Sequence, residues 1–514
     1  MARQPNILLI MADQMSATAM PFSGGPAVAP NIERLADEGV AFEAAYCNSP
    51  LCAPSRFSML SGQLPSRIGG YDNAAEFPAT VPTLAHYLRA GGYRTCLSGK
   101  MHFVGPDQLH GYEERVTTDI YPADFGWTPN WDEPETRYQW FHNMLSVVEA
   151  GVYERSIQLD FDDDVGYQAV RKIYDFARDT DDRPFFLTAS FTQPHDPYFA
   201  PRQYWDRYDH DAVAPPTVGM IPPDERDPHS RRLYYLYGMD QYDLTAAHVR
   251  NARHAYLAMI SYIDDRVGEL LRALEVTGLR QDTIVILTAD HGDMLGERGM
   301  WYKMSFFEPS IRVPLIIQAP GRFAARRVSQ GVSLLDLLPT LVDFAADGQR
   351  ASEPAVSLDG TSLAPLLHGD DEVDSTVVGE YLAEATPDPI FMVRRWPYKY
   401  VAGASDPPQL FDLSADPEEL TNLADQPDHA ETVSAFAAEV ADRWDQASIH
   451  DQVLASQRAR RLTYESLRKG QPTHWDYEPR WDVSRQYTRN HESMDDSDRR
   501  ARIPRREPPL PDHS

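Results

Sequence analysis

The sequence predicts an α/β fold in which helices flank a mostly parallel central sheet, followed by a smaller C-terminal α+β domain on an antiparallel sheet. Through the first two thirds of the chain, short apolar segments alternate with segments of helical spacing. From about residue 375, short strand-like segments follow one another with turn residues between them. The 514 residues are enough for one large domain and a smaller one.

The elements of the large domain are predicted from apolar runs and from apolar residues repeated at three- and four-residue spacing. The helix over 30–38 ends at Gly39, and the helix over 83–89 is followed by Gly91 and Gly92, which are typical helix stops. The predicted set comprises strands over 7–11, 93–98, 184–191, 283–289 and 313–318, and helices over 30–38, 83–89, 164–178 and 251–274.

The C-terminal part of the chain is predicted from the same signals. Its elements are strands over 377–382, 390–394, 398–402 and 409–413, and helices over 430–444 and 452–467. From about Gly470 the chain is rich in Pro, Trp, Asp and Arg and lacks periodicity, which fits a disordered tail or an arm that docks elsewhere. We therefore expect a large domain over 1–374, a smaller one over 375–469, and a tail over 470–514 at a subunit interface.

Composition excludes several classes of protein. The 48 basic and 77 acidic residues give a net charge of −29, which argues against a nucleic-acid partner. The three cysteines, Cys47, Cys52 and Cys96, are too few and odd in number for a disulfide framework. No apolar run approaches the length of a membrane span. The short apolar run over 6–10 is followed by Asp13 and resembles a strand more than a signal peptide, so we expect a cytoplasmic location.

The strongest local motif is Cys-Ala-Pro-Ser-Arg at residues 52–56. Pro54 suits the first turn of a helix, so Cys52 is expected at a helix N-terminus, where free amides attract an anion. Arg56 would add charge-assisted hydrogen bonds to a sulfate or phosphate oxygen. The alternative is a buried cysteine before an ordinary helix, because a motif this short also occurs by chance.

Polar residues follow the predicted strands. Asp13 comes after the first strand and Asp290 with His291 after the strand over 283–289, and oxygen ligands suit a hard cation such as Ca²⁺ or Mg²⁺. Basic side chains follow other strands and the Asp290 loop: Lys100, His102, His195 and Lys303. Asp13 alone is more often a cap or turn residue, and each basic residue alone is more often a surface or satisfied residue. For the motif over 290–293, a structural role and metal binding are about equally common. Together, five chain segments that supply suitable polar residues predict a shared crevice at the carboxyl ends of the strands.

These motifs together resemble the type I sulfatase family, over nearly the whole chain. The stretches that carry the resemblance are 6–14, 52–56, 99–102, 290–293, 336–340, 359–361 and 410–413. The resemblance implies an alkaline-phosphatase-like fold and oxidation of Cys52 to formylglycine, whose hydrated aldehyde supplies the nucleophile. It also implies one divalent metal ion, for which we favour Ca²⁺ over Mg²⁺ or Mn²⁺. The metal ligands that the resemblance implies are Asp13, Gln14, residue 52, Asp290 and His291.

Two positions depart from many arylsulfatases, which carry Asp where this chain has Gln14 and Asn where it has His291. Both variants resemble the choline sulfatase and phosphonate monoesterase branch. The stretches 71–77, 105–110, 118–124 and 294–303 are similar to choline sulfatases, cytosolic enzymes that release choline and sulfate from choline-O-sulfate. The resemblance therefore implies choline-O-sulfate as substrate, a formylglycine-generating or equivalent modifying enzyme as partner, and no membrane partner.

Roles follow for individual residues on this hypothesis. Arg56, Lys100, His102, Lys303 and Asn73 would contact the transferring sulfate group, and His195 or His102 would protonate the leaving alkoxide. A permanent cation without N–H donors must be held by aromatic faces and carboxylates. The candidates are Trp127, His142, Glu384 and Asp495. Trp131 and Trp140 are at least as well explained as core residues. Asp495 lies in the tail, which we expect to close a neighbouring subunit's pocket in a homodimer or homotetramer.

Two further hypotheses stay open. A phosphonate monoester or phosphodiester hydrolase, or a promiscuous arylsulfatase, would need the same scaffold, because sulfate and phosphate esters share a tetrahedral shape. A non-enzymatic protein that binds anions or quaternary ammonium compounds would need only part of the site. The intact set of Cys52, Arg56, Asp13 and Asp290 argues against this last hypothesis.

Overall fold

The structure is a computed structural model, and it describes residues 4–346, 354–370 and 375–480. Its main feature is a nine-stranded sheet with the strand order β10-β2-β9-β8-β1-β6-β3-β4, in which β11 pairs with β2. All neighbouring strands run parallel except β9, which is antiparallel to both β8 and β2. The strands are β1 Asn6–Ala12, β2 Val40–Tyr46, β3 Arg94–Gly99, β4 Glu114–Arg115, β6 Phe185–Ser190, β8 Thr283–Ala289, β9 Arg312–Gln318, β10 Arg326–Val328 and β11 Val332–Ser333. The predicted mostly parallel α/β class is confirmed.

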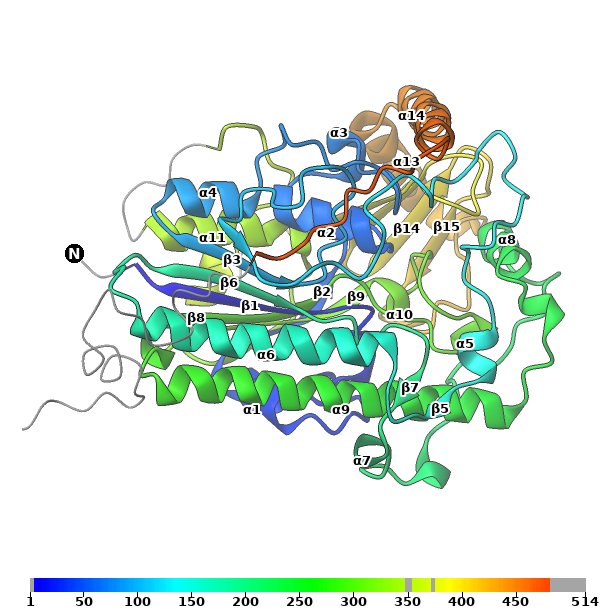
Figure 1. Cartoon of the computed structure of the whole chain (residues 1–514). Coiled ribbons are helices and arrows are strands. Elements are labelled where there is room, and N and C mark those ends of the chain that lie inside the picture. Colours follow the sequence, from blue (N-terminus) through cyan, green and yellow to red (C-terminus); the bar gives the residue numbers. More distant parts are fainter. Residues whose placement is uncertain (1–3, 347–353, 371–374, 481–514) are drawn as a thin grey trace, which may run out of the picture.

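Helices cover both faces of this sheet (Figure 1). The lower face in the figure carries α1 Pro30–Glu38, α6 Ile157–Arg178 and α9 Ala246–Val276, and the upper face carries α2 Cys52–Ser61, α4 Leu84–Ala90 and α11 Leu337–Ala346. Because both faces are covered, the central strands are apolar throughout, and every residue of β1 and β8 is buried. The shorter elements are α3 Pro65–Ile68, α5 Leu145–Val148, β5 Gly151–Val152, β7 Phe199–Ala200, α7 Arg202–Trp205, α8 Pro228–Leu236, α10 Glu308–Ile311 and α12 Ala364–His368.

A second, antiparallel sheet follows in the order β12-β13-β14-β15. Its strands are β12 Val377–Tyr381, β13 Ile390–Arg395, β14 Tyr398–Gly403 and β15 Gln409–Asp412. The helices α13 Ala430–Arg443 and α14 Gln446–Leu467 come next, and the Phe436 ring of α13 stacks on Tyr400 at 5.7 Å. The predicted antiparallel sheet is therefore confirmed, whereas the division of the chain into domains at 374 and 469 stays a prediction.

Three helices begin earlier than predicted. Helix α6 starts after Ser156, whose side chain accepts a hydrogen bond from the Leu159 amide, and α9 starts after Thr245, which forms a capping box with His248. Helix α14 starts after Asp445, whose carboxylate accepts from the Ser448 amide. In each helix the first turn is set by a polar cap rather than by apolar periodicity, which explains the difference.

Strand β2 was not predicted, although it lies inside the sheet between β9 and β10. Its sequence, Val-Ala-Phe-Glu-Ala-Ala-Tyr, has weak strand signals, and its pairing with β9 shifts register between Phe42 and Ala45. Burial on both faces of the sheet stabilises this strand despite its alanines. The chain continues from the end of β2 to Cys52, the first residue of α2.

The first part of the C-terminal segment packs on the protein's own large domain (Figure 1). The Trp475 ring lies 5.2 Å from Phe125, edge to face. The Tyr477 hydroxyl donates to the Arg115 carbonyl oxygen at 3.2 Å, and the Arg115 guanidinium lies over the Tyr477 ring. Asp495 lies outside the described residues. Among the described helices, none combines the length and apolar character that crossing a bilayer requires.

Candidate active site

The carboxyl ends of five strands, β1, β2, β3, β6 and β8, lie at one edge of the large sheet, and His195 follows β6. Asp13, Lys100 and Asp290 directly follow β1, β3 and β8. Strand β9 is antiparallel to both β2 and β8, so β2 runs in the same direction as β8 and ends at the same edge, with Cys52 six residues later. Lys303 follows no strand of its own, because it lies in the same loop after β8 as Asp290.

Cys52 is the first residue of α2, as the position of Pro54 predicted. The next amide, that of Ala53, donates to Asn73 Oδ1 at 3.0 Å, and the Ser55 hydroxyl donates to the Asp290 carbonyl oxygen at 2.6 Å. Burial, with a smaller contribution from Asp13, raises the pKa of the Cys52 thiol to about 11. The thiol is therefore protonated at neutral pH and is a poor nucleophile in its unmodified form.

Four buried residues, Asp13, Cys52, Asp290 and His291, each place a possible metal ligand atom within 4.8 Å of the others. His291 Nδ1 lies 3.0 Å from the Gly292 carbonyl oxygen. A carbonyl only accepts, so Nδ1 carries the proton and Nε2 presents a lone pair. That Nε2 atom lies 3.3 Å from Cys52 Sγ and 3.6 Å from Asp13 Oδ1. Burial lowers the pKa of His291 to about 4, so the ring is neutral and suited to metal binding.

Gln14 links this group to Lys303. Its side-chain oxygen accepts from Lys303 Nζ at 2.6 Å, its amide nitrogen donates to Asp293 Oδ2 at 2.7 Å, and its backbone N–H donates to Asp290 Oδ1 at 3.0 Å. Gln14 has a φ of 64°, and His102 has a φ of 58°. Positive φ is costly for residues other than glycine, and such strain is concentrated at functional sites.

Arg56 and Lys100 surround the two carboxylates with positive charge. Arg56 Nε donates to Asp290 Oδ2 at 2.8 Å, and its Nη1 donates to the Lys100 carbonyl oxygen and to Ser190 Oγ. Lys100 Nζ pairs with the Asp13 carboxylate. Burial alone would raise the pKa of Asp13, but the charges of Lys100 and Arg56 outweigh burial and hold that pKa well below its usual value. Arg56 Nη2 lies 3.7 Å from Asp13 Oδ2 in an ion pair and makes no hydrogen bond within the described residues, so its N–H groups are available to a ligand.

The hydrogen bond between Lys303 and His195 has a defined donor and acceptor. The nitrogen of Lys303 lies 2.8 Å from His195 Nε2, and His195 Nδ1 lies 2.6 Å from the Asp196 carbonyl oxygen. Nδ1 must be the donor to that carbonyl, so Nε2 accepts from Lys303. Burial and the Lys303 charge hold the pKa of His195 well below its usual value. His195 is therefore neutral beside a charged lysine.

His102 is buried, and neither of its ring nitrogens has a hydrogen-bond partner in the described part of the chain. Burial, reinforced by Lys100, lowers its pKa to about 3. Its ring lies 5.2 Å from Tyr121 and 5.8 Å from Trp127. Two unpaired nitrogens in a buried ring are unusual, and they leave His102 able to bind a ligand.

A line of aromatic rings extends from Tyr121, which lies under Lys100 Nζ at 4.2 Å. Trp127 lies 5.2 Å from Tyr121 and stacks on Trp140 at 6.3 Å. The line continues through Phe141 to Tyr237, and the Tyr237 hydroxyl donates to Glu384 Oε1 at 3.2 Å. Burial raises the pKa of Glu384 to about 7.

Three residues near this line of rings, His142, Trp131 and Trp140, were considered in the sequence analysis as substrate-binding or core residues. His142 lies 5.7 Å from both His195 and Tyr237, and 3.4 Å from an Asp196 carboxylate oxygen. Trp131 is a core residue whose indole donates to the Ala383 carbonyl oxygen at 2.6 Å. Trp140 is partly buried and stacks on both Trp127 and Tyr138, so it braces Trp127.

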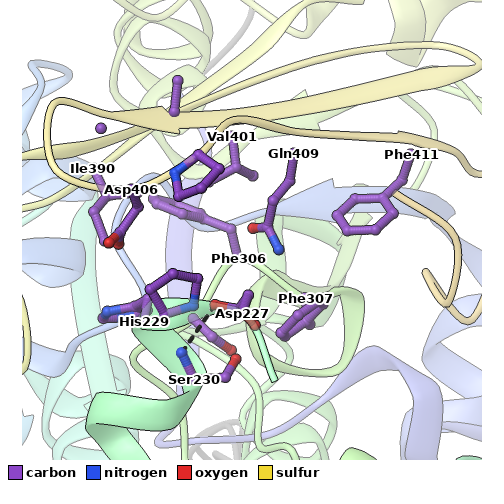
Figure 2. Close-up of a pocket in the computed structure, with 15 residues that line it drawn as sticks. Asp227, His229, Ser230, Phe306, Phe307, Ile390, Val401, Asp406, Gln409 and Phe411 are labelled. Atoms are coloured by element: carbon purple, nitrogen blue, oxygen red, sulfur yellow. Dashed lines mark hydrogen bonds between the residues drawn. The ribbon is translucent and has the colours of Figure 1, made fainter. Parts of the chain in front are cut away.

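Helix α8 connects the loop of Lys303 with that of Glu384 through hydrogen bonds of His229. Figure 2 shows His229 among the residues that line a small cavity. The two ring nitrogens of His229 lie 2.6 Å from the Met304 carbonyl oxygen and 3.2 Å from that of Ala385. Arg232 also donates to the Ala385 carbonyl oxygen, at 2.7 Å. A small cavity of about 30 Å³ lies beside His229, and none of the predicted site residues lines it. It is large enough only for water.

Several residues of the site were not singled out from the sequence. They are Tyr121, Ser190, Asp196, Tyr237 and Asp293. Asp293 lies within the quoted motif over 290–293, and Asp196 directly follows His195, so both had a local signal. Ser190 and Tyr237 had none, because they reach the site only through the course of the chain.

Family profiles match nearly the whole chain. The profile described as Sulfatase matches residues 5–347, N-sulphoglucosamine sulphohydrolase, C-terminal, matches 296–446, and Choline sulfatase enzyme C terminal matches 451–503. The choline-sulfatase of Rhizobium meliloti (strain 1021) is 48% identical over 515 residues, which cover 98% of this chain and 99% of that protein. Human arylsulfatase K is 30% identical, with 82% and 79% covered.

Solved structures share the fold. A phosphonate monoester hydrolase from Silicibacter pomeroyi superposes with a TM-score of 0.69 at 22% identity, covering 86% of this chain and 95% of that one. The phosphonate monoester hydrolase of Agrobacterium radiobacter gives 0.67 at 24%, with 88% and 96% covered. These likenesses confirm the expected alkaline-phosphatase-like fold and carry no further conclusion. With the profile match over 5–347 and the 48% identity, the chain is an enzyme that belongs to the sulfatase family.

Proposed function

We propose that this protein is a choline sulfatase, which hydrolyses choline-O-sulfate to choline and sulfate. One observation carries the proposal: the buried cations Arg56, Lys100 and Lys303 lie beside a line of aromatic rings that leads to Glu384. Positive charge suits the sulfate group, and ring faces with a carboxylate suit a quaternary ammonium group. The 48% identity to the choline-sulfatase of Rhizobium meliloti supports the same substrate.

The residues around Cys52 fit a divalent metal ion and a formylglycine at position 52. Two carboxylates and the Nε2 lone pair of His291 converge beside Cys52, a donor set that suits a divalent ion, and we favour Ca²⁺ over Mg²⁺ or Mn²⁺. The pKa of about 11 supports Cys52 as a precursor rather than as the nucleophile itself. When present, the metal would stabilise charge on sulfate, and hydrated formylglycine would supply one hydroxyl to attack sulfur and a second to release sulfate.

The cations of the site bind and orient the sulfate group. Arg56 is fixed by Asp290 and Ser190, and its Nη2 makes no hydrogen bond within the described residues, so it can donate to a sulfate oxygen without moving. Lys100 and Lys303 add positive charge beside Asp13 and Gln14. Because these groups are held in place by buried partners, they stabilise the charge that develops on the sulfate without reorganising.

The leaving alkoxide needs a proton because an alkyl alcohol is a poor leaving group. Lys303 and His195 share a hydrogen bond, so Lys303 can supply a proton directly or through His195 Nε2. His102, with a pKa of about 3, is neutral and is better suited to donate a hydrogen bond than to act as an acid. We therefore assign the proton donor to the Lys303–His195 pair.

The cation end is assigned to Trp127, His142 and Glu384. Trp127 is partly exposed and braced by Trp140, so its ring face is available to a trimethylammonium group. Glu384 is buried with a single side-chain donor, the Tyr237 hydroxyl, so a nearby cation would favour its charged form.

The test is a side-by-side measurement of kcat/KM on choline-O-sulfate, an aryl sulfate and a phosphonate monoester. We expect choline-O-sulfate to be preferred by at least about a hundredfold, because only it uses both ends of the site. The second candidate is a phosphonate monoester hydrolase, which the shared fold favours. The cations that we assign to sulfate binding in this protein could also bind a phosphonate, which has the same tetrahedral shape. A higher kcat/KM on the phosphonate would establish that candidate instead.

We also propose a homodimer or homotetramer in which the C-terminal segment contributes to substrate binding. Trp475 packs on Phe125, which is close in sequence to Trp127. Tyr477 packs on Arg115, which pairs with Asp119, and Asp119 accepts a hydrogen bond from the His102 amide. Truncation after Gly470 should raise KM for choline-O-sulfate, and light scattering should give the subunit number. A cytoplasmic location and a formylglycine-generating enzyme as partner complete the proposal.

A further inference from the structure

Arg460 of α14 makes a buried, bidentate ion pair with a residue far away in the sequence. Its Nη1 and Nη2 atoms each lie 2.7 Å from one carboxylate oxygen of Asp72. Nη1 also donates to Thr128 Oγ1 at 3.1 Å. The side chain of Asp72 is fully buried and that of Arg460 is 7% exposed. Two parallel hydrogen bonds fix the orientation of a guanidinium as well as its distance, so this contact determines geometry.

Both partners of Arg460 are direct neighbours of site residues. Asp72 precedes Asn73, whose side-chain oxygen accepts from the Ala53 amide at the start of α2. Thr128 follows Trp127, and its hydroxyl donates to the Phe125 carbonyl oxygen at 2.8 Å, which leaves its lone pairs for Arg460. One guanidinium therefore joins the loop that contacts the nucleophile helix to the loop that carries Trp127.

A second contact from the same helix supports the second loop. Gln457, one turn before Arg460, is buried and accepts from the Trp131 backbone N–H at 2.8 Å. Both residues lie in the stretch that matches the choline sulfatase C-terminal profile, over 451–503. Helix α14 thus binds the loop around Trp127 through side chains that the large domain alone cannot supply.

We propose that Arg460 is a positioning residue for substrate selectivity, which keeps Trp127 at a fixed distance from Cys52 at the start of α2. This inference rests on the assignment of Trp127 to the cation end of the substrate. Sulfate and trimethylammonium groups are joined by a short linker, so the two loops must keep a fixed separation for both ends to bind at once. Small displacements of a binding group reduce catalysis strongly. Arg460 keeps that separation without touching the substrate.

The test compares choline-O-sulfate with its neutral isostere, in which a tert-butyl group replaces the trimethylammonium group. In Arg460→Met, kcat/KM for choline-O-sulfate should fall roughly tenfold further than kcat/KM for the isostere, mainly through KM. Arg460→Lys keeps the charge but cannot make the two parallel hydrogen bonds of a guanidinium, and it should restore part of the preference for choline-O-sulfate. The matched control is Arg443→Met, because Arg443 lies on the preceding helix α13 and pairs with Glu439 of that same helix rather than with the Trp127 loop. It should leave both substrates unchanged.

A second variant covers the case in which Arg460→Met does not fold. Thr128→Val keeps the buried ion pair and removes the Thr128 hydroxyl, which accepts from Arg460 and donates to the Phe125 carbonyl oxygen. It should lower the preference for choline-O-sulfate in the same direction. Equal losses on both substrates in Arg460→Met or Thr128→Val, or no loss in either, would overturn the inference. If Trp127→Ala itself does not discriminate between the substrates, the proposed function fails. If Trp127→Ala discriminates and the Arg460 and Thr128 variants do not, only the role of Arg460 fails.

Discussion

Lys303 Nζ lies 2.8 Å from His195 Nε2, and the other nitrogen of that imidazole is held by the Asp196 carbonyl oxygen at 2.6 Å. The carbonyl sets the tautomer, so the lysine is the donor and the histidine the acceptor. The two residues come from loops after β6 and β8, and we propose that they act as one proton-carrying unit.

Lys303→Met should therefore slow substrates according to their leaving group. We expect kcat on choline-O-sulfate to fall by about a hundredfold or more, because an alkoxide needs a proton as it leaves. An aryl sulfate with an acidic phenol should lose far less. The measurement is kcat on both esters, and equal losses would mean that Lys303 serves only to bind the sulfate.

Cys52 should be found as formylglycine when the protein is produced with a modifying enzyme. Mass spectrometry of the peptide that contains residue 52 should detect the loss of mass expected when a thiol side chain becomes an aldehyde. Cys52→Ala should abolish turnover, whereas a change of one small buried side chain should cost only about 1 kcal/mol of stability. A Cys52→Ala protein that still turned over would remove residue 52 from the mechanism.

Exhaustive chelation should remove activity, and a divalent ion should restore it, with Ca²⁺ favoured over Mg²⁺ or Mn²⁺. The reason is that two carboxylates and a neutral imidazole nitrogen meet beside Cys52. His291→Phe removes a direct ligand nitrogen and should weaken metal binding by at least about tenfold to a hundredfold, the loss typical of removing even an outer-shell partner. Elemental analysis and a metal titration of the apoprotein give the readout. Full activity in protein without metal would contradict the site.

Trp127→Ala should raise KM for choline-O-sulfate by about tenfold to thirtyfold, because a cation–π contact in a desolvated site contributes about 2 kcal/mol. The neutral tert-butyl isostere should lose much less. The control is Trp131→Phe, since this indole is a core residue that donates to Ala383. It should lower the melting temperature and leave the ratio of the two KM values unchanged. The cation end would have to lie elsewhere if both tryptophan changes affected that ratio alike.

Glu384 should make stability depend on pH in a defined direction. Burial raises its pKa from 4.5 to about 7, so between these values the folded protein binds a proton that the unfolded chain has lost. Stability then falls as pH rises through this window. Glu384→Gln should not lose this stability, because glutamine does not titrate. Relative to the wild type, the variant should gain about 3 kcal/mol between pH 4.5 and pH 7, at about 1.4 kcal/mol for each unit. Denaturant unfolding at several pH values measures the difference, and a constant difference would refute the shift.

The same carboxyl should affect substrate binding. A bound cation favours the ionised form of Glu384, so KM for choline-O-sulfate should fall as pH rises through 7. The neutral isostere should show no such dependence, and Glu384→Gln should abolish it. A KM that did not respond to pH in the wild type would place Glu384 outside the pocket.

Much of the fold and of the reacting centre could be predicted from local signals. The buried strands β1 and β8 are apolar runs, and the start of α2 at Cys52 follows from Pro54. Asp13, Lys100 and Asp290 directly follow strands, so a parallel sheet brings them to one edge. Strand β2 was missed because its alanines carry little strand preference, and it is stabilised only by burial between its neighbours.

The sequence by itself determined the class of fold and which residue types meet at the sheet edge, because strand ends and helix caps are local properties. Only the tertiary structure decided how the site is held. The direction of the Lys303–His195 hydrogen bond depends on a carbonyl, and the Glu384 pKa depends on burial. The pairing of Arg460 with Asp72 joins residues 388 positions apart. Such contacts depend on distance in space, desolvation and the course of the chain, which no local pattern encodes.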